Sequence, residues 1–270
     1  MSVSRSVPSS VAAVLGELEL QRPTVVTTGW LTRAVTDLGL AASPDTVLRQ
    51  LRSRGWLLPL RVQGAWEFAP GDRAGAVSGG DPFIEVRALA LVRPQLLVAV
   101  GFESAAFLRS LSSRPPAREV IVCAEGTPPI RALDHLRRVD LTVPQEAYTV
   151  LGGLSVATRA GLLAAIAIRP GAFGDWPGLA GWLSTAATDV DSDQLARLLA
   201  GRPAAAWARA GYLLRRGGNV STSDRLLAAR PPGAGPFYLG PRRPGGTYDA
   251  AADVVDSVVG KFAETGQGRS

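Results

Sequence analysis

Residues 8–68 carry a series of local patterns whose order constrains the fold more than any other feature of the chain. Residues 8–22 repeat apolar side chains at helical spacing until Pro23, which disfavours helical angles in the residue before it. A β-branched run at 24–26 predicts a short strand, and residues 28–38 predict a second helix. A third helix and a β-hairpin follow. Helix, strand, helix, helix and hairpin form the order of a winged helix-turn-helix.

The third helix, from about Ser43 to Arg54, has the clearest boundaries. Ser43 is the expected N-cap, Pro44 suits the first helical position, and Gly55 ends the helix. The predicted buried stripe is Val47, Leu48 and Leu51. By helical spacing, the opposite face carries Asp45, Thr46, Arg49, Arg52 and Ser53. This second face is therefore free to meet a ligand.

Alternating apolar residues on either side of Gln63 and Gly64 predict the hairpin, with strands at 58–62 and 66–68. In a winged helix-turn-helix the third helix would enter the major groove, and the hairpin would approach the backbone or minor groove. From Ser43 to Gly64 there are four arginines and one acidic residue, which favours DNA binding. The alternative is a small helical domain whose hairpin contacts another protein.

The overall charge is basic and comes almost entirely from arginine. The chain has 29 Lys plus Arg against 23 acidic residues, and Lys261 is its only lysine. Arginine suits phosphate oxygens and guanine edges, although a GC-rich genome explains part of the bias equally well. With no long apolar run, no secretory signal and a single cysteine, Cys123, the chain is expected to be soluble and cytoplasmic, with no membrane partner.

A stretch of Gly, Pro and small residues between 70 and 82 indicates a boundary. We expect an α+β protein with a DNA-binding winged helix-turn-helix at 1–76 and a larger mixed α/β domain at 81–270. The patterns of this second domain predict strands at 119–123, 139–143 and 237–240, and helices at 83–91, 157–168, 192–200, 204–215 and 248–259.

The chain lacks the residues that catalysis usually needs. Its single histidine, His135, lies among arginines, and no Gly-x-Ser-x-Gly or phosphate-binding Gly-Lys motif is present. Asp189, Asp191 and Asp193 lack the glycine and glutamate of a calcium loop, so they are interpreted as capping the helix that begins near Ser192. No enzyme, metal site or cofactor site is predicted.

A second basic region lies between Gly201 and Thr247, where eight arginines face a single acidic residue, Asp224. Three interpretations remain open: a solvated face, a second contact with the DNA backbone, and a surface for an acidic partner. Within this region Arg242 and Arg243 lie in a predicted exposed turn.

Several segments, taken in order, resemble the AbiEi family of abortive-infection antitoxin regulators. None is a catalytic signature, and the resemblance rests on their number and order. The segments are Arg22–Thr27, Asp45–Trp56 with its Leu-Arg-x-x-Gly-Trp ending, Gly64–Phe68, Ile168–Gly174, Leu198–Pro203, Ala206–Trp207 and Tyr212–Leu214.

The resemblance implies an antitoxin with two activities. Its winged helix would bind inverted repeats in the promoter of its own operon, and its second domain would counter a nucleotidyltransferase-like toxin, by direct contact or indirectly. The expected DNA-binding residues are Ser43, Thr46, Arg49, Arg52, Ser53, Arg61, Gln63, Arg242 and Arg243. Two alternatives remain: a stand-alone regulator whose second domain senses a small molecule, and a nuclease or other enzyme with a DNA-binding appendage.

Overall fold

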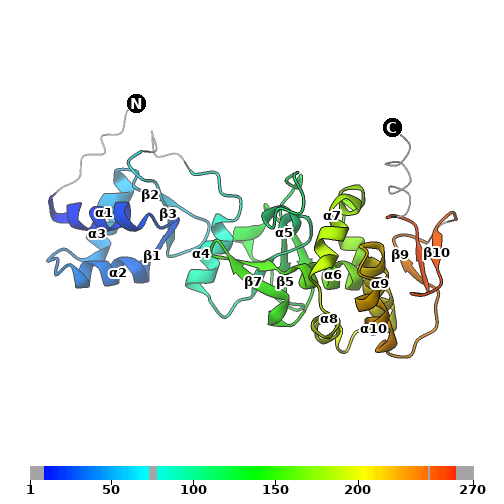
Figure 1. Ribbon diagram of the computed structural model, residues 1–270. Helices are drawn as coiled ribbons and strands as arrows, with labels where there is room; N and C mark the ends of the chain where they lie inside the picture. Colours follow the sequence, from blue (N-terminus) through cyan, green and yellow to red (C-terminus); the bar gives the residue numbers. More distant parts are fainter. Residues whose placement is uncertain (1–8, 73–77, 243, 260–270) are drawn as a thin grey trace. The chain divides into compact units, whose positions relative to one another are not determined.

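The computed structural model describes residues 9–72, 78–242 and 244–259, and contacts between Cα atoms divide the chain into two compact units (Figure 1). The first unit comprises residues 1–97 and 129–135, and the second comprises residues 98–128 and 136–270. The mixed helix and strand content of the two units confirms the α+β class.

The first unit contains the predicted order of elements. It consists of α1 (Ser9–Gln21), β1 (Val25–Thr27), α2 (Thr28–Asp37), α3 (Pro44–Ser53), β2 (Leu57–Pro59), β3 (Ala65–Phe68), α4 (Ile84–Val92) and a short 3-10 helix, η2 (Arg131–Leu133). The three strands form one antiparallel sheet in the order β1-β3-β2. Apolar residues of the three N-terminal helices and of the sheet share one core, which includes the fully buried Leu18, Leu31, Leu51 and Phe68.

The first unit extends past the predicted boundary at 76–81, because α4 packs against β1 and β3. Phe83, Ile84, Val86 and Leu89 are all buried, so this helix has an apolar face that the sheet covers. The buried carboxylate of Glu67 accepts a hydrogen bond from the Gly79 amide at 2.5 Å, which ties the connecting segment to β3. The sequence placed α4 in the second domain because only the glycine-rich linker was visible as a boundary.

The second unit is built around α6 (Arg159–Ile168), whose residues from Ala160 to Ala167 are all buried. Its sequence is apolar on every side, as expected of a helix that neighbours enclose completely. Gly161 is required at its start, since an added Cβ would lie 2.1 Å from the carbonyl oxygen of Ala147. The helices in contact with α6 are α5 (Phe102–Leu108), α7 (Trp176–Thr188), α8 (Ser192–Leu199) and α9 (Ala204–Arg216).

A five-stranded sheet in the order β6-β5-β4-β8-β7 lies on one side of this helical layer (Figure 1). Its strands are β4 (Val98–Val100), β5 (Val120–Cys123), β6 (Arg137–Asp140), β7 (Tyr148–Leu151) and β8 (Leu154–Ala157). Two neighbouring pairs, β4 with β8 and β5 with β6, are parallel, and the other two pairs are antiparallel. The β7–β8 hairpin was absent from the sequence prediction. Two short 3-10 helices, η3 (Gln145–Ala147) and η4 (Pro170–Ala172), connect the sheet and helices.

The end of the chain differs from the prediction. The expected helix at 248–259 is wrong: the segment forms β10 (Thr247–Asp249) and β11 (Val254–Asp256), which join β9 (Phe237–Leu239) in a small sheet after α10 (Val220–Ala228). Asp253 has a positive φ of 58°, which breaks helical geometry, and β11 pairs in parallel with β9. Long-range pairing therefore overrides a local pattern that fits either structure.

Candidate functional site

Helix α3 presents one face to the core and the other to solvent. Val47 and Leu51 are fully buried, whereas Arg49 and Arg52 are exposed. Within the part of the chain that the structure describes, neither guanidinium has an ion-pair or hydrogen-bond partner. The predicted division of the helix into a buried stripe and an open basic face is therefore confirmed.

Three smaller polar residues on this helix are partly engaged in its own structure. The Ser43 hydroxyl accepts a hydrogen bond from the Thr46 amide at 3.3 Å and donates to the Thr46 hydroxyl at 3.0 Å, so it is the predicted N-cap. The Ser53 hydroxyl donates to the carbonyl of Gln50 at 3.0 Å. These contacts leave lone pairs open on the oxygens, but the two arginines are the side chains best placed to reach a ligand.

The hairpin beside α3 is shorter than predicted. The first strand ends at Pro59, and Arg61 and Gln63 lie in the turn with exposed side chains, while Val62 folds back into the core. The Gly64 carbonyl accepts a hydrogen bond from the Thr28 amide at 3.0 Å, which anchors the turn to the start of α2. Gly64 has a φ of 78°, which favours glycine at this position.

The arginine-rich region from 201 to 247 is largely occupied by contacts inside the second unit. Arg209 donates to the carbonyls of Tyr238 at 2.7 Å and Ala167 at 3.2 Å, and burial lowers its pKa. Arg202, Arg215, Arg225 and Arg230 also have partners within the unit. Arg216 is exposed, Arg242 lies over the Tyr238 ring at 4.9 Å, and Arg243 lies outside the described residues. The number of arginines in this region is therefore larger than the number of guanidinium groups that are available to a ligand.

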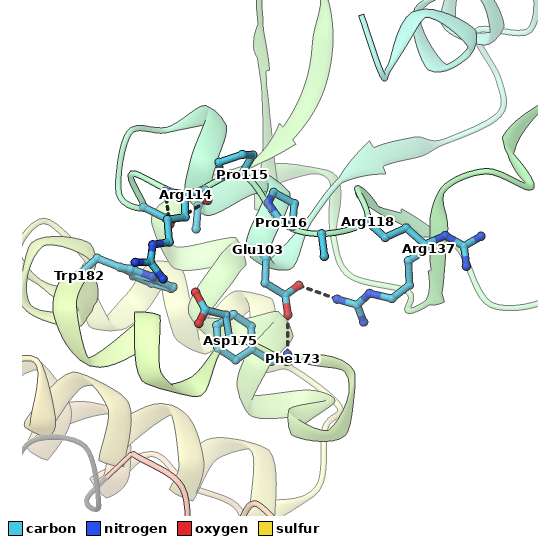
Figure 2. Close-up of a pocket in the computed structure, with 13 residues that line it drawn as sticks. Glu103, Arg114, Pro115, Pro116, Arg118, Arg137, Phe173, Asp175 and Trp182 are labelled. Atoms are coloured by element: carbon cyan, nitrogen blue, oxygen red, sulfur yellow. Dashed lines mark hydrogen bonds and ion pairs between the residues drawn. The ribbon is translucent and has the colours of Figure 1, made fainter.

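A pocket of about 560 Å³ lies in the second unit between α5, the loop at 112–118 and the start of α7 (Figure 2). The Glu103 carboxylate bonds to Arg137 at 2.5 Å and also accepts a hydrogen bond from the Gly174 amide. Arg137 in turn donates to the Ala172 carbonyl at 2.6 Å. This network joins β6 to the segment before α7 and so fixes one wall of the pocket.

Residues 98–216, all of which belong to the second unit except 129–135, match the family model described as the AbiEi antitoxin C-terminal domain. This part of the chain is similar to AbiEi antitoxin C-terminal domains, and we call residues 98–216 the AbiEi domain. The match confirms the resemblance found in the sequence and supports an antitoxin role in a toxin–antitoxin system. A comparison with curated proteins found no match.

The whole chain is also similar to a solved structure, the crystal structure of the RV2827C protein from Mycobacterium tuberculosis. The two are 27% identical, the match covers 98% of this chain and 97% of that chain, and the TM-score is 0.78. The likeness thus extends over the first unit, which the AbiEi domain match leaves out.

Sequence patterns missed the pocket of the AbiEi domain because its residues come from separate segments of the chain. The Arg-Pro-Pro run at 114–116 was a visible turn signal, but the facing segment at 173–175 is distant in sequence. Arg33 is also exposed, on α2, and the sequence prediction did not include it among the expected DNA-binding residues. The capping interpretation is confirmed for Asp191, which accepts hydrogen bonds from the Asp193 and Gln194 amides at the start of α8. Asp189 pairs with Arg159 instead.

Among the residues described, no helix has the length and apolar character needed to cross a bilayer. No cluster of three or more histidine, cysteine or carboxylate side chains is placed to hold a metal in the same residues. His135 lies 3.7 Å from the Glu85 carboxylate, in the first unit.

Proposed function

We propose that this chain is an autoregulating antitoxin that binds double-stranded DNA in the promoter of its own operon and counters a nucleotidyltransferase-like toxin. The observation that carries the DNA-binding half is the pair Arg49 and Arg52, exposed and without ion-pair partners among the described residues, on a helix whose other face is buried. The AbiEi domain at 98–216 supports the antitoxin half. The proposed action takes place in the cytoplasm and requires no catalysis.

In this proposal α3 enters the major groove of each half of an inverted repeat. Arg49 and Arg52 bind base edges or phosphates, since a guanidinium matches the O6 and N7 acceptors of guanine in two hydrogen bonds. Ser43 and Thr46 lie at the N-terminal end of α3, where the helix dipole and the free amides favour a phosphate. Ser53 lies on the same open face of the helix.

The hairpin turn supplies a second contact. Arg61 and Gln63 are both exposed there, and the anchor between Gly64 and Thr28 keeps the turn close to α2. We assign them contacts with the sugar–phosphate backbone, which set the register of the protein on DNA without reading its sequence. Arg242 and Arg243 remain candidates for an additional backbone contact from the second unit.

The test of DNA binding is retardation of a promoter fragment by the full chain and by R49A/R52A. We expect the double variant to lose specific retardation while its thermal unfolding stays unchanged. The matched control is R197A/R216A, which removes the same charge from two exposed arginines of the second unit that have no ion-pair partner among the described residues. Equal binding by the wild type and R49A/R52A would contradict the assignment of α3.

The antitoxin half is tested by co-expression with the proposed partner, a nucleotidyltransferase-like toxin encoded in the same operon. The full-length R49A/R52A variant should restore growth as well as the wild type does, because the DNA-binding face is not needed to counter the toxin. A pull-down of toxin by the same variant distinguishes direct contact from indirect action. Loss of growth rescue by R49A/R52A would show that the two activities are not separable.

A further inference from the structure

We propose that the pocket between α5 and α7 of the AbiEi domain binds a small organic anion with a flat apolar body. Its volume of about 560 Å³ lies within the usual range for small-molecule sites. Thirteen residues line it, and all belong to the second unit. The proposal does not rest on the proposed antitoxin and DNA-binding functions.

The two carboxylates that line the pocket are already neutralised or bonded by the protein. Glu103 is held by Arg137 at 2.5 Å and by the Gly174 amide, and its side chain is only 11% exposed (Figure 2). Asp175 accepts the Gly178 amide at 3.0 Å as the N-cap of α7. Three arginines and these two carboxylates line the pocket, so its charged side chains sum to +1, which favours an anionic ligand over a cation.

Among the lining arginines, Arg114 has the guanidinium that is most open to a ligand. Its backbone bonds to the Ser112 hydroxyl, but its side chain has no hydrogen bond or ion pair within the described ranges. Arg118, also on the lining, donates to the Leu136 carbonyl at 3.0 Å. A partnerless guanidinium offers its paired N–H groups to a carboxylate, sulfonate or phosphate group.

The rest of the lining is apolar and held in place. Phe173 and Trp182 are buried, and their rings meet edge to face with centroids 6.2 Å apart. Ala106, Pro115, Pro116 and Ala117 add further apolar surface around them. Aromatic and proline side chains that cannot rotate freely lose little ordering entropy on binding, and their flat surfaces suit a flat apolar ligand.

The test uses 8-anilinonaphthalene-1-sulfonate, an aromatic monoanion, as the probe, and its neutral analogue N-phenyl-1-naphthylamine as the charge control. Titration calorimetry of the full chain should give one saturable site for the anion. Ala117→Trp places an indole in the pocket from an exposed position and should weaken binding of either compound at least about tenfold. Ala228→Trp, at an exposed site on α10, is the matched control.

Arg114→Gln tests the charge contribution. It should weaken binding of the sulfonate roughly three- to tenfold and leave the neutral analogue unchanged, as expected for one partly exposed ionic contact. Arg197→Gln removes the same charge from α8 and should change neither affinity. All variants should retain promoter binding, so failure here is distinguishable from failure of the proposed function. Equal affinity of Ala117→Trp and Ala228→Trp for the sulfonate, or absence of a saturable site, would overturn the proposal.

Discussion

The two arginine-rich regions of this molecule have a similar share of arginine, but their side chains make different contacts. On α3 and the hairpin turn, Arg49, Arg52 and Arg61 are exposed and lack internal ion pairs among the residues described. Between 201 and 247, Arg209 and Arg230 instead bond to backbone carbonyls of other elements. A count of basic residues therefore does not separate a ligand-binding face from a structural one.

The difference follows from the supply of carbonyl acceptors near each arginine. The central carbonyls of a helix such as α3 are bonded within the helix, so arginines on its open face find few acceptors. Arg209 instead lies opposite the last turn of α6, where the Ala167 carbonyl has no partner within the helix, and opposite Tyr238 of β9. Where the ends of several elements meet, their unbonded carbonyls bind arginine side chains. Arg209 therefore acts as an internal clamp between α6 and β9.

The largest effect is expected from Arg209→Met, which removes this clamp and leaves two partly buried carbonyls without a donor. We expect the second unit to lose about 2–4 kcal/mol of unfolding free energy, as for other broken buried networks. Urea unfolding followed by tryptophan fluorescence measures the loss. DNA binding of the folded variant should be unchanged. A loss of unfolding free energy below about 0.5 kcal/mol would mean that Arg209, like Arg49 and Arg52, does not stabilise the fold.

Arg49→Ala is the converse experiment on the first unit. Because the side chain is exposed and without an ion-pair partner, the unfolding free energy should change by less than about 0.5 kcal/mol. Affinity for promoter DNA should fall by about 1–3 kcal/mol, and a loss confined to specific sites would indicate contact with a base. Arg216→Ala, the same change on α9, is the control. If Arg49→Ala instead lowered the unfolding free energy and left DNA affinity normal, Arg49 would be a structural residue and not a DNA contact.

The same contrast explains which elements were predictable from sequence. Helix α3 is encoded locally, by Ser43 as N-cap, Pro44 at the first helical position and Gly55 after the end, and the structure matches at each of these. Strand β11 depends instead on more distant partners, since it pairs in parallel with β9, and β10 pairs with β11. The buried Asp256 carboxylate, for example, accepts a hydrogen bond from the Tyr212 hydroxyl at 2.6 Å, 44 residues away.

The residues of the candidate sites also differ in how far they could be predicted from sequence. Arg49 and Arg52 could be chosen from helical spacing alone, because exposure of a helix face follows from the position of its apolar residues. The short first strand and longer turn of the hairpin could not be foreseen, since the turn is anchored by a contact between Thr28 and Gly64, which are 36 residues apart. The pocket of the AbiEi domain required the 112–118 loop and Phe173 to be brought together by the tertiary fold.

Alkaline pH should destabilise the second unit more than the first, because all four tyrosines lie in the second unit. Burial, aided by the hydrogen bond to Asp256, raises the pKa of Tyr212 in the folded state, and burial likewise raises the pKa of Tyr148. The unfolded state therefore loses these protons first, and stability falls as pH rises above about 10, by about 1.4 kcal/mol per pH unit for each such group.

Urea unfolding of the second unit between pH 8 and 11 checks this expectation. Tyr212→Phe should reduce the alkaline slope, although the variant also loses the bond to Asp256 and starts from a lower stability. Tyr238→Phe is the control, because the Tyr238 hydroxyl makes no hydrogen bond among the described residues. An unchanged slope in Tyr212→Phe would assign the alkaline loss to another group.

The smallest effect concerns Arg61, whose turn position suits a phosphate contact more than a base contact. Each neutralised phosphate adds about 0.9 to the slope of log affinity against log salt for duplex DNA. Arg61→Gln should therefore lower the slope by about one and weaken specific and non-specific DNA similarly. Arg225→Gln, in the region whose arginines bond mostly within the second unit, should leave the slope unchanged. If instead Arg225→Gln lowered the slope and Arg61→Gln did not, the 201–247 region would be the one that faces DNA, and the contrast between the two regions would fail.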